Sequence, residues 1–119
     1  MGVMVVRESQ IAAFQQQNLG RFENETVQRL RAGHPEETAE MTDDELRQLA
    51  ADGVPVAFSY GITLESDVAR FVEYLFLYGA DFYEQPKFQW TRNILTSTKL
   101  NGTEKMDWMD KLDYVVRSL

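Results

Sequence analysis

The sequence predicts an all-α protein in which about five helices form a single-domain bundle. Apolar residues recur at three- and four-residue spacing over several long stretches, which is typical of amphipathic helices. Helix start and stop signals bracket these stretches, and strand-like alternation is brief. The 119 residues, 44% of them hydrophobic, suffice for one core and are too few for two. We expect one domain over residues 1–119, with residues 1–7 flexible or in part an artificial leader before a natural start at Met4.

The first predicted helix runs from Glu8 to Leu30 and ends at the Ala-Gly-His-Pro sequence of residues 32–35. Gly20 lies inside the pattern and indicates a kink or a close packing contact. An acidic connector follows over residues 36–41. The apolar face of this helix comprises Ile11, Phe14, Leu19, Phe22, Val27 and Leu30.

The second predicted helix spans Asp43 to Tyr60. Thr42 and Glu45 have the spacing of a capping box, in which each side chain accepts a hydrogen bond from the other residue's backbone amide. Gly53 and Pro55 interrupt the pattern, so we expect a kinked helix or two short ones. The apolar face comprises Leu46, Leu49, Ala50, Ala57 and Phe58.

The third predicted helix occupies the stretch from Tyr60 to Phe82. Thr63 is expected to cap its first turn, where acidic residues follow. Gly79 is expected to end it, because glycine readily adopts the left-handed backbone conformation. The buried face comprises Val68, Phe71, Val72, Leu75 and Phe76.

Two further helices are expected after an aromatic loop that ends at Pro86. A short one over residues 88–96 would bury Trp90, Ile94 and Leu95. Asn101 and Gly102 indicate a turn, after which Thr103 is expected to cap the last helix. The apolar residues of that helix are Met106, Met109, Leu112, Val116 and Leu119.

Charge and composition narrow the class of partner. The net charge is −7, and the sequence contains no basic patch that would bind nucleic acid. The same negative charge disfavours binding to an anionic membrane surface. No apolar run reaches the length of a transmembrane helix. The absence of cysteine excludes disulfides and thiolate metal sites and is compatible with the cytoplasm, where we expect the protein to act. We expect no cofactor, and either a protein partner or a second copy of the chain.

Catalytic candidates are sparse. His34, the single histidine, is expected to be a residue at a helix C-terminus, favoured there by the helix dipole. Asp81 and Glu84 flank the aromatic loop, but Asp81 is expected to cap the turn that follows it. Three acids at three-residue spacing on the last helix, Asp107, Asp110 and Asp113, are expected to form a solvated polar face.

Aromatic residues suggest a binding surface instead. Phe71, Phe76, Phe82 and Trp90 are expected in the core, whereas the tyrosines are open to two interpretations. They either lie in the core with their hydroxyls at the surface, or anchor a protein interface. The predicted partner-binding residues are Tyr74, Tyr78, Tyr83, Glu84, Asp107 and Asp110.

The order of several short motifs resembles that of a group of small bacterial proteins encoded beside type VI secretion genes, among spike components and toxic effectors. The motifs are Arg21-Phe22-Glu23, Tyr60-Gly61-Ile62-Thr63, Glu65, Asp67 to Phe71, Gly79, Asp81-Phe82, Pro86, Trp90, Ile94-Leu95 and Glu104 to Asp107. Pro55 departs from the pattern. The resemblance implies an accessory role, either as an adaptor or chaperone for an effector or spike protein or as an immunity protein that neutralises a toxin, and it provides no catalytic residues.

Three functions follow as hypotheses. The first is such a non-enzymatic adaptor, whose acidic face, at residues 36–45 or at Asp107 to Asp113, meets a basic partner. The second is an immunity protein that neutralises a cognate toxin. The third is a small enzyme or effector that uses Asp81, Glu84 or the acids of the last helix.

Overall fold

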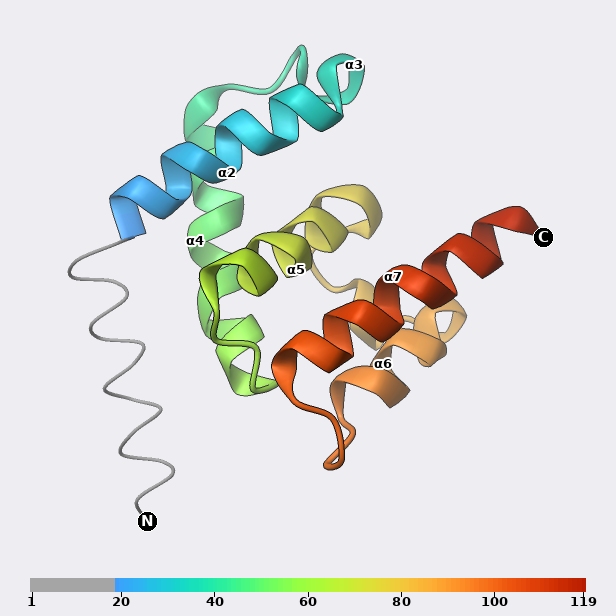
Figure 1. Cartoon of the computed structure of the whole chain (residues 1–119). Coiled ribbons are helices and arrows are strands. Elements are labelled where there is room, and N and C mark those ends of the chain that lie inside the picture. Colours follow the sequence, from blue (N-terminus) through green and yellow to red (C-terminus); the bar gives the residue numbers. More distant parts are fainter. Residues whose placement is uncertain (1–18) are drawn as a thin grey trace, which may run out of the picture.

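The computed structural model describes residues 19–119, which contain helices and no strand (Figure 1). The prediction of an all-α bundle is confirmed. The predicted helix start at Glu8, its apolar residues Ile11 and Phe14, and the expectations for residues 1–7 lie outside the described residues. The described elements are α2 (Leu19–Gly33), α3 (Pro35–Thr38), α4 (Asp43–Ser59), α5 (Glu65–Tyr78), the 3-10 turns η2 (Phe82–Glu84) and η3 (Pro86–Phe88), α6 (Gln89–Leu95) and α7 (Gly102–Ser118).

Helix α2 lies across α4, and its apolar face packs inward as the spacing predicts (Figure 1). Phe22 joins the main core, whereas Val27 and Leu30 form a second, smaller cluster with Leu46 of α4. A Cβ added at Gly20 would meet no atom within 4 Å among residues 19–119, so of the two alternatives for this glycine the close packing contact is wrong. The expected connector over residues 36–41 is wrong in part, because its first residues form the single turn of α3.

Helix α4 begins with the predicted capping box of Thr42 and Glu45, and both reciprocal hydrogen bonds are present. It continues without interruption through Gly53 and Pro55, so the alternative of two short helices is wrong. Gly53 has a packing role. A Cβ at this position would lie 2.9 Å from side-chain carbons of Val72 and Leu75, so glycine lets α5 approach α4 closely.

Helix α5 lies in the middle of the fold and contributes the largest part of the main core (Figure 1). It begins two residues after Thr63. Leu64 occupies the cap position and no side chain caps the first turn, so the predicted cap at Thr63 is wrong. Gly79 ends the helix with φ of 104°, as predicted for a glycine stop. Phe76 turns to the smaller cluster instead of the main core.

The last two helices follow the predicted order, but the last one begins earlier than predicted. The aromatic loop folds into η2 and η3, and α6 buries Ile94 and Leu95 while Trp90 is half-buried. Asn101, not Thr103, caps α7 by a capping box with Glu104. The Asn-Gly pair therefore starts the helix, because the asparagine side chain accepts the hydrogen bond from the third helical amide.

Candidate functional site

A row of polar side chains joins α5 to α7, and we call it the α5–α7 seam. Residues three or four apart share one face of a helix, so each helix presents its members in a line toward the other. Every member on α5 contacts at least one member on α7. The members are Asp67, Arg70, Tyr74 and Tyr78 on α5, and Thr103, Asp107, Asp110 and Asp113 on α7.

Arg70 is the centre of the seam. Its guanidinium donates to Asp67 of its own helix at 3.1 Å and reaches across to Asp107 at 2.9 Å and Asp110 at 2.8 Å. Burial lowers the pKa of Arg70, but the hydrogen bonds to the three carboxylates outweigh burial and raise the pKa above its ordinary value. Arg70 therefore stays charged and ties the two helices together.

Two tyrosine hydroxyls extend the seam toward the end of α7. Tyr74 donates to Asp110 at 2.7 Å, and Tyr78 donates to Asp113. Burial, followed by these hydrogen bonds, raises the pKa of both phenols. Tyr74 is only 5% exposed, so of its two interpretations the structure favours a core tyrosine, and a role in partner binding stays a prediction. Tyr78 is half-buried and stacks on Phe88, with ring centroids 4.8 Å apart.

The expectation that the acids of α7 form a solvated face is therefore wrong in part. Asp107 and Asp110 are more than half exposed, yet both bind Arg70. Asp113 is largely covered and also forms an ion pair with Arg117 one turn later, whose Nε donates to the Tyr78 hydroxyl. The three-residue spacing indicates a shared helix face, but it does not show that an arginine and two tyrosines lie opposite.

Tyr83 and Glu84, the other predicted partner-binding residues, lie in η2, away from the seam. Tyr83 is half-buried and meets Tyr60 and Phe82 edge-on. Glu84 is exposed. Asp81 was expected to cap the turn after it, but its side chain makes no such hydrogen bond. It instead accepts a hydrogen bond from the Gln85 side chain. The structure does not bring these carboxylates together with a second catalytic group.

His34 lies directly after the end of α2, as predicted, but its contacts with α5 were not predictable from the sequence. Its Nε2 lies 2.7 Å from a carboxylate oxygen of Glu73, and its ring packs against Phe76 at 5.4 Å. His34 therefore holds the junction of α2 and α3 against α5. No group of three or more potential ligands within residues 19–119 could hold a metal ion.

A hollow of about 380 Å³ opens between His34, α5 and the distal half of α7. It places two of the predicted binding residues, Tyr74 and Asp110, beside the side chain of Tyr114, which sequence reasoning did not select. Tyr114 is 75% exposed. The lining residues are His34, Glu73, Tyr74, Leu77, Asp110, Asp113, Tyr114 and Arg117.

The distal half of α7 also carries an apolar face that the described part of the chain leaves uncovered. Leu112 is half-buried, but Val115, Val116 and Leu119 are 48%, 46% and 100% exposed. Val116 and Leu119 follow the apolar periodicity of α7, but they are exposed because α7 extends beyond the helices that cover its first half (Figure 1). We call Trp108, Leu112, Val115, Val116 and Leu119 the α7 stripe, because their spacing places them along one side of the helix.

Free acidic charge is concentrated at α3. Glu36, Glu37 and Glu40 are exposed and form no ion pair within the described residues. The acids of the seam, in contrast, are neutralised by Arg70 and Arg117. Of the two acidic faces that the sequence suggests, the one at residues 36–45 has more unpaired carboxylates, although Asp43 and Asp44 within it bind Arg31 and Arg47.

Comparisons with known proteins give no relative. No family model matches the sequence, and no curated protein or solved structure matches it significantly. Among the helices of residues 19–119, none combines the length and the apolar character required to cross a bilayer.

Tyr74 should make the stability of the protein sensitive to alkaline pH. A tyrosine in the unfolded chain has a pKa of about 10. In the folded chain, burial and the hydrogen bond to Asp110 hold the pKa of Tyr74 higher. Above about pH 10 the folded chain binds more protons than the unfolded chain, so the free energy of unfolding falls as pH rises. Below about pH 10 the contribution of the Tyr74 hydroxyl to stability is fully present. Urea unfolding at a series of pH values measures the slope.

Two phenylalanine variants provide the comparison for this prediction. Tyr74→Phe should flatten the decline in stability above about pH 10, because the group that ionises is absent. Tyr114→Phe removes the hydroxyl of an exposed tyrosine and should leave the profile unchanged. Equal slopes for the wild type and Tyr74→Phe would contradict the assignment.

Proposed function

We propose that this chain is a non-enzymatic accessory protein that binds a protein partner through the α7 stripe. The observation that carries the proposal is the exposure of Val115, Val116 and Leu119 next to Trp108 on one helix face. Contiguous apolar side chains at the surface of a soluble protein mark interaction sites. Trp108, a member of the stripe that is 44% exposed, supplies an aromatic side chain of the kind that dominates binding energy at interfaces.

The class of partner follows from charge and from the resemblance in sequence. The unpaired acids of α3 favour a partner with a basic surface, because complementary charge speeds encounter. The motif order resembles proteins encoded beside type VI secretion genes, so the proposed partner is an effector or a spike protein of such a system. The proposed role is that of an adaptor or chaperone acting in the cytoplasm.

Affinity purification from the cells that encode the protein, with quantitative mass spectrometry, tests the proposal. A spike protein or effector should be recovered in stoichiometric amount. Val115→Ser combined with Val116→Ser should reduce its recovery by about tenfold or more, because polar groups replace the apolar contact. Leu64→Ser is the matched control, since Leu64 is 59% exposed at the start of α5, outside the stripe.

Three results would contradict the proposal. One is a preparation that contains no partner from cells in which the secretion system is active. Another is a partner whose recovery falls equally in the Leu64→Ser control. The third is concentration-dependent self-association in light scattering that the stripe variant abolishes, because the stripe would then be an interface between copies of the chain.

Toxin assays separate the adaptor from the immunity protein. An immunity protein restores growth of cells that express the partner toxin and inhibits the toxin in a one-to-one complex. An adaptor leaves the toxin active, and its deletion abolishes export. The proposed function predicts the second outcome.

A further inference from the structure

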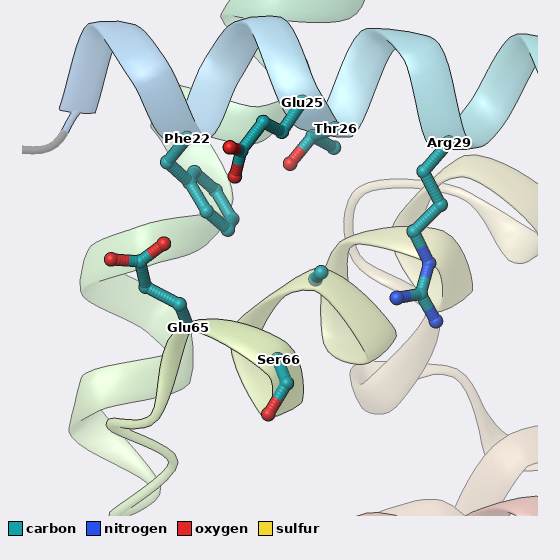
Figure 2. A pocket seen from close by; sticks show the side chains of 7 residues that line it. Phe22, Glu25, Thr26, Arg29, Glu65 and Ser66 are labelled. Atoms are coloured by element: carbon teal, nitrogen blue, oxygen red, sulfur yellow. The ribbon is translucent and has the colours of Figure 1, made fainter.

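A second hollow, of about 380 Å³, lies between α2 and α5, on residues that the proposed function does not use (Figure 2). Small side chains line it, namely Thr26 on α2 and Ser66 and Ala69 on α5. The ring of Phe22 and the methyl group of Ala69 provide apolar surface. The lining residues are Phe22, Glu25, Thr26, Arg29, Glu65, Ser66 and Ala69.

The hydroxyl of Thr26 has no partner within the described residues. Thr26 is 2% exposed, and its oxygen is directed into the space between the two helices (Figure 2). Thr38, Thr91 and Thr96 differ from it, because each donates its hydroxyl hydrogen to a backbone carbonyl three or four residues earlier. No side-chain polar atom of the described residues is both fully buried and unpaired, so the Thr26 hydroxyl is accessible from the hollow, where water can bond it. A ligand in the hollow can replace that water as its hydrogen-bond partner.

The charged side chains at one end of the hollow are firmly paired with opposite charges, and the one at the other end is only loosely paired. Arg21 binds both Glu25 at 3.1 Å and Glu65 at 2.7 Å, so these carboxylates are paired. Arg29, at the other end in Figure 2, makes only a loose ion pair with Glu73, at 3.7 Å, and donates no hydrogen bond within the described chain. Glu73 lies closer to His34 than to Arg29. The guanidinium donors of Arg29 are therefore open to an anion.

A carboxylate matches this arrangement better than a phosphate. The planar guanidinium binds a carboxylate through two parallel hydrogen bonds. Glu25 and Glu65 line the same hollow, and their charge disfavours a dianion more than a monoanion. Thr26 is one helical turn from Arg29, so its hydroxyl can bond the same ligand. The volume of the hollow is at the small end of ligand sites, which limits the ligand to a short apolar body.

We propose that the hollow between α2 and α5 binds a monocarboxylate with a short apolar body. Arg29 binds the carboxylate, Thr26 donates a hydrogen bond to it, and the apolar body lies on Phe22 and Ala69. Such a group occurs in a free branched short-chain acid and at the C-terminus of a polypeptide that ends in a small apolar residue. Both sources present the same chemistry to these side chains.

Titration of the labelled protein, followed by amide chemical shifts, tests this site. The probes are isobutyrate and acetyl-alanyl-valine, each with its neutral amide for comparison. Both acids should produce saturable shifts at residues of α2 and α5 around the hollow, and the amides should bind several-fold more weakly. Tighter binding of the peptide acid identifies a polypeptide C-terminus as the source, and tighter binding of isobutyrate identifies a free acid.

Variants separate the site from general charge effects. Arg29→Gln and Thr26→Val should each weaken binding of the acids, whereas Arg92→Gln, which removes an exposed arginine from α6, should not. Shifts no larger than those from sodium chloride at equal ionic strength, or binding that Arg29→Gln leaves intact, would overturn the proposal.

Discussion

Replacing Gly102 by alanine is expected to lower the free energy of unfolding by about 3 kcal/mol, at the upper end of the usual cost of overpacking. Gly102 is the first residue of α7 and presses against the turn that follows α4. An added Cβ would lie 2.6 Å from the carbonyl oxygen of Gly61 and 2.9 Å from the Cα of Ile62. Both atoms belong to the backbone, so no side-chain rotation relieves the overlap.

Denaturant unfolding of Gly102→Ala measures this effect, and Gly33→Ala is the matched control. Gly33 is the last residue of α2, and an added Cβ would have no other atom within 4 Å. Alanine there should be neutral or should stabilise by up to about 1 kcal/mol, because it restricts the unfolded chain. A loss of similar size in both variants would show that the close approach at Gly61 is not the cause.

Replacing Arg70 by methionine is expected to cost about 2–4 kcal/mol, slightly less than the removal of one partner from a fully buried ion pair. The substitution leaves three carboxylates without their cation. Asp67 is the critical one, because its side chain is only 4% exposed and only Thr103 would still donate to it. Asp107 and Asp110 are more than half exposed, and hydration reduces their share of the cost.

Arg47→Met provides the comparison for Arg70→Met in the same unfolding experiment. Arg47 also binds carboxylates, but its partner Asp44 is 95% exposed. Its loss should cost less than about 1 kcal/mol, as for other surface ion pairs. Adding Asp67→Asn to Arg70→Met should recover part of the lost stability, because no unpaired charge then remains buried. Equal costs for the two arginine variants would contradict the central role of Arg70.

Local signals predicted the helices well but did not always predict where they begin. Thr103 and Asn101 are both good capping residues, and only Asn101 has glutamate three positions later. That spacing was a usable signal. Thr63 has no glutamate three positions later, and α5 begins one residue further on, with Leu64 at the cap position. Gly53 was interpreted as a helix breaker, because the approach of α5 is not visible in local sequence.

The site was harder to predict for a different reason. Spacing shows which residues share a helix face, but it does not show which face of another helix lies opposite. Tyr74 and Asp110 were both selected as partner-binding residues, yet they bind each other. The same limit explains Val116 and Leu119, whose periodicity is that of a buried face although no described element covers them.

The attachment of α7 at one end has a consequence for the exchange of its amide hydrogens. Near its start, Lys105 donates to the carbonyl of Tyr60 and Gly102 packs on Gly61, so opening there requires disruption of the core. Beyond Asp113 the helix contributes few buried atoms, and its last turns can fray without cost to the rest of the fold. Solvent exchange should therefore slow progressively from the last turn of α7 back to Met106. A partner that binds the free end would remove this gradient by protecting the last turn.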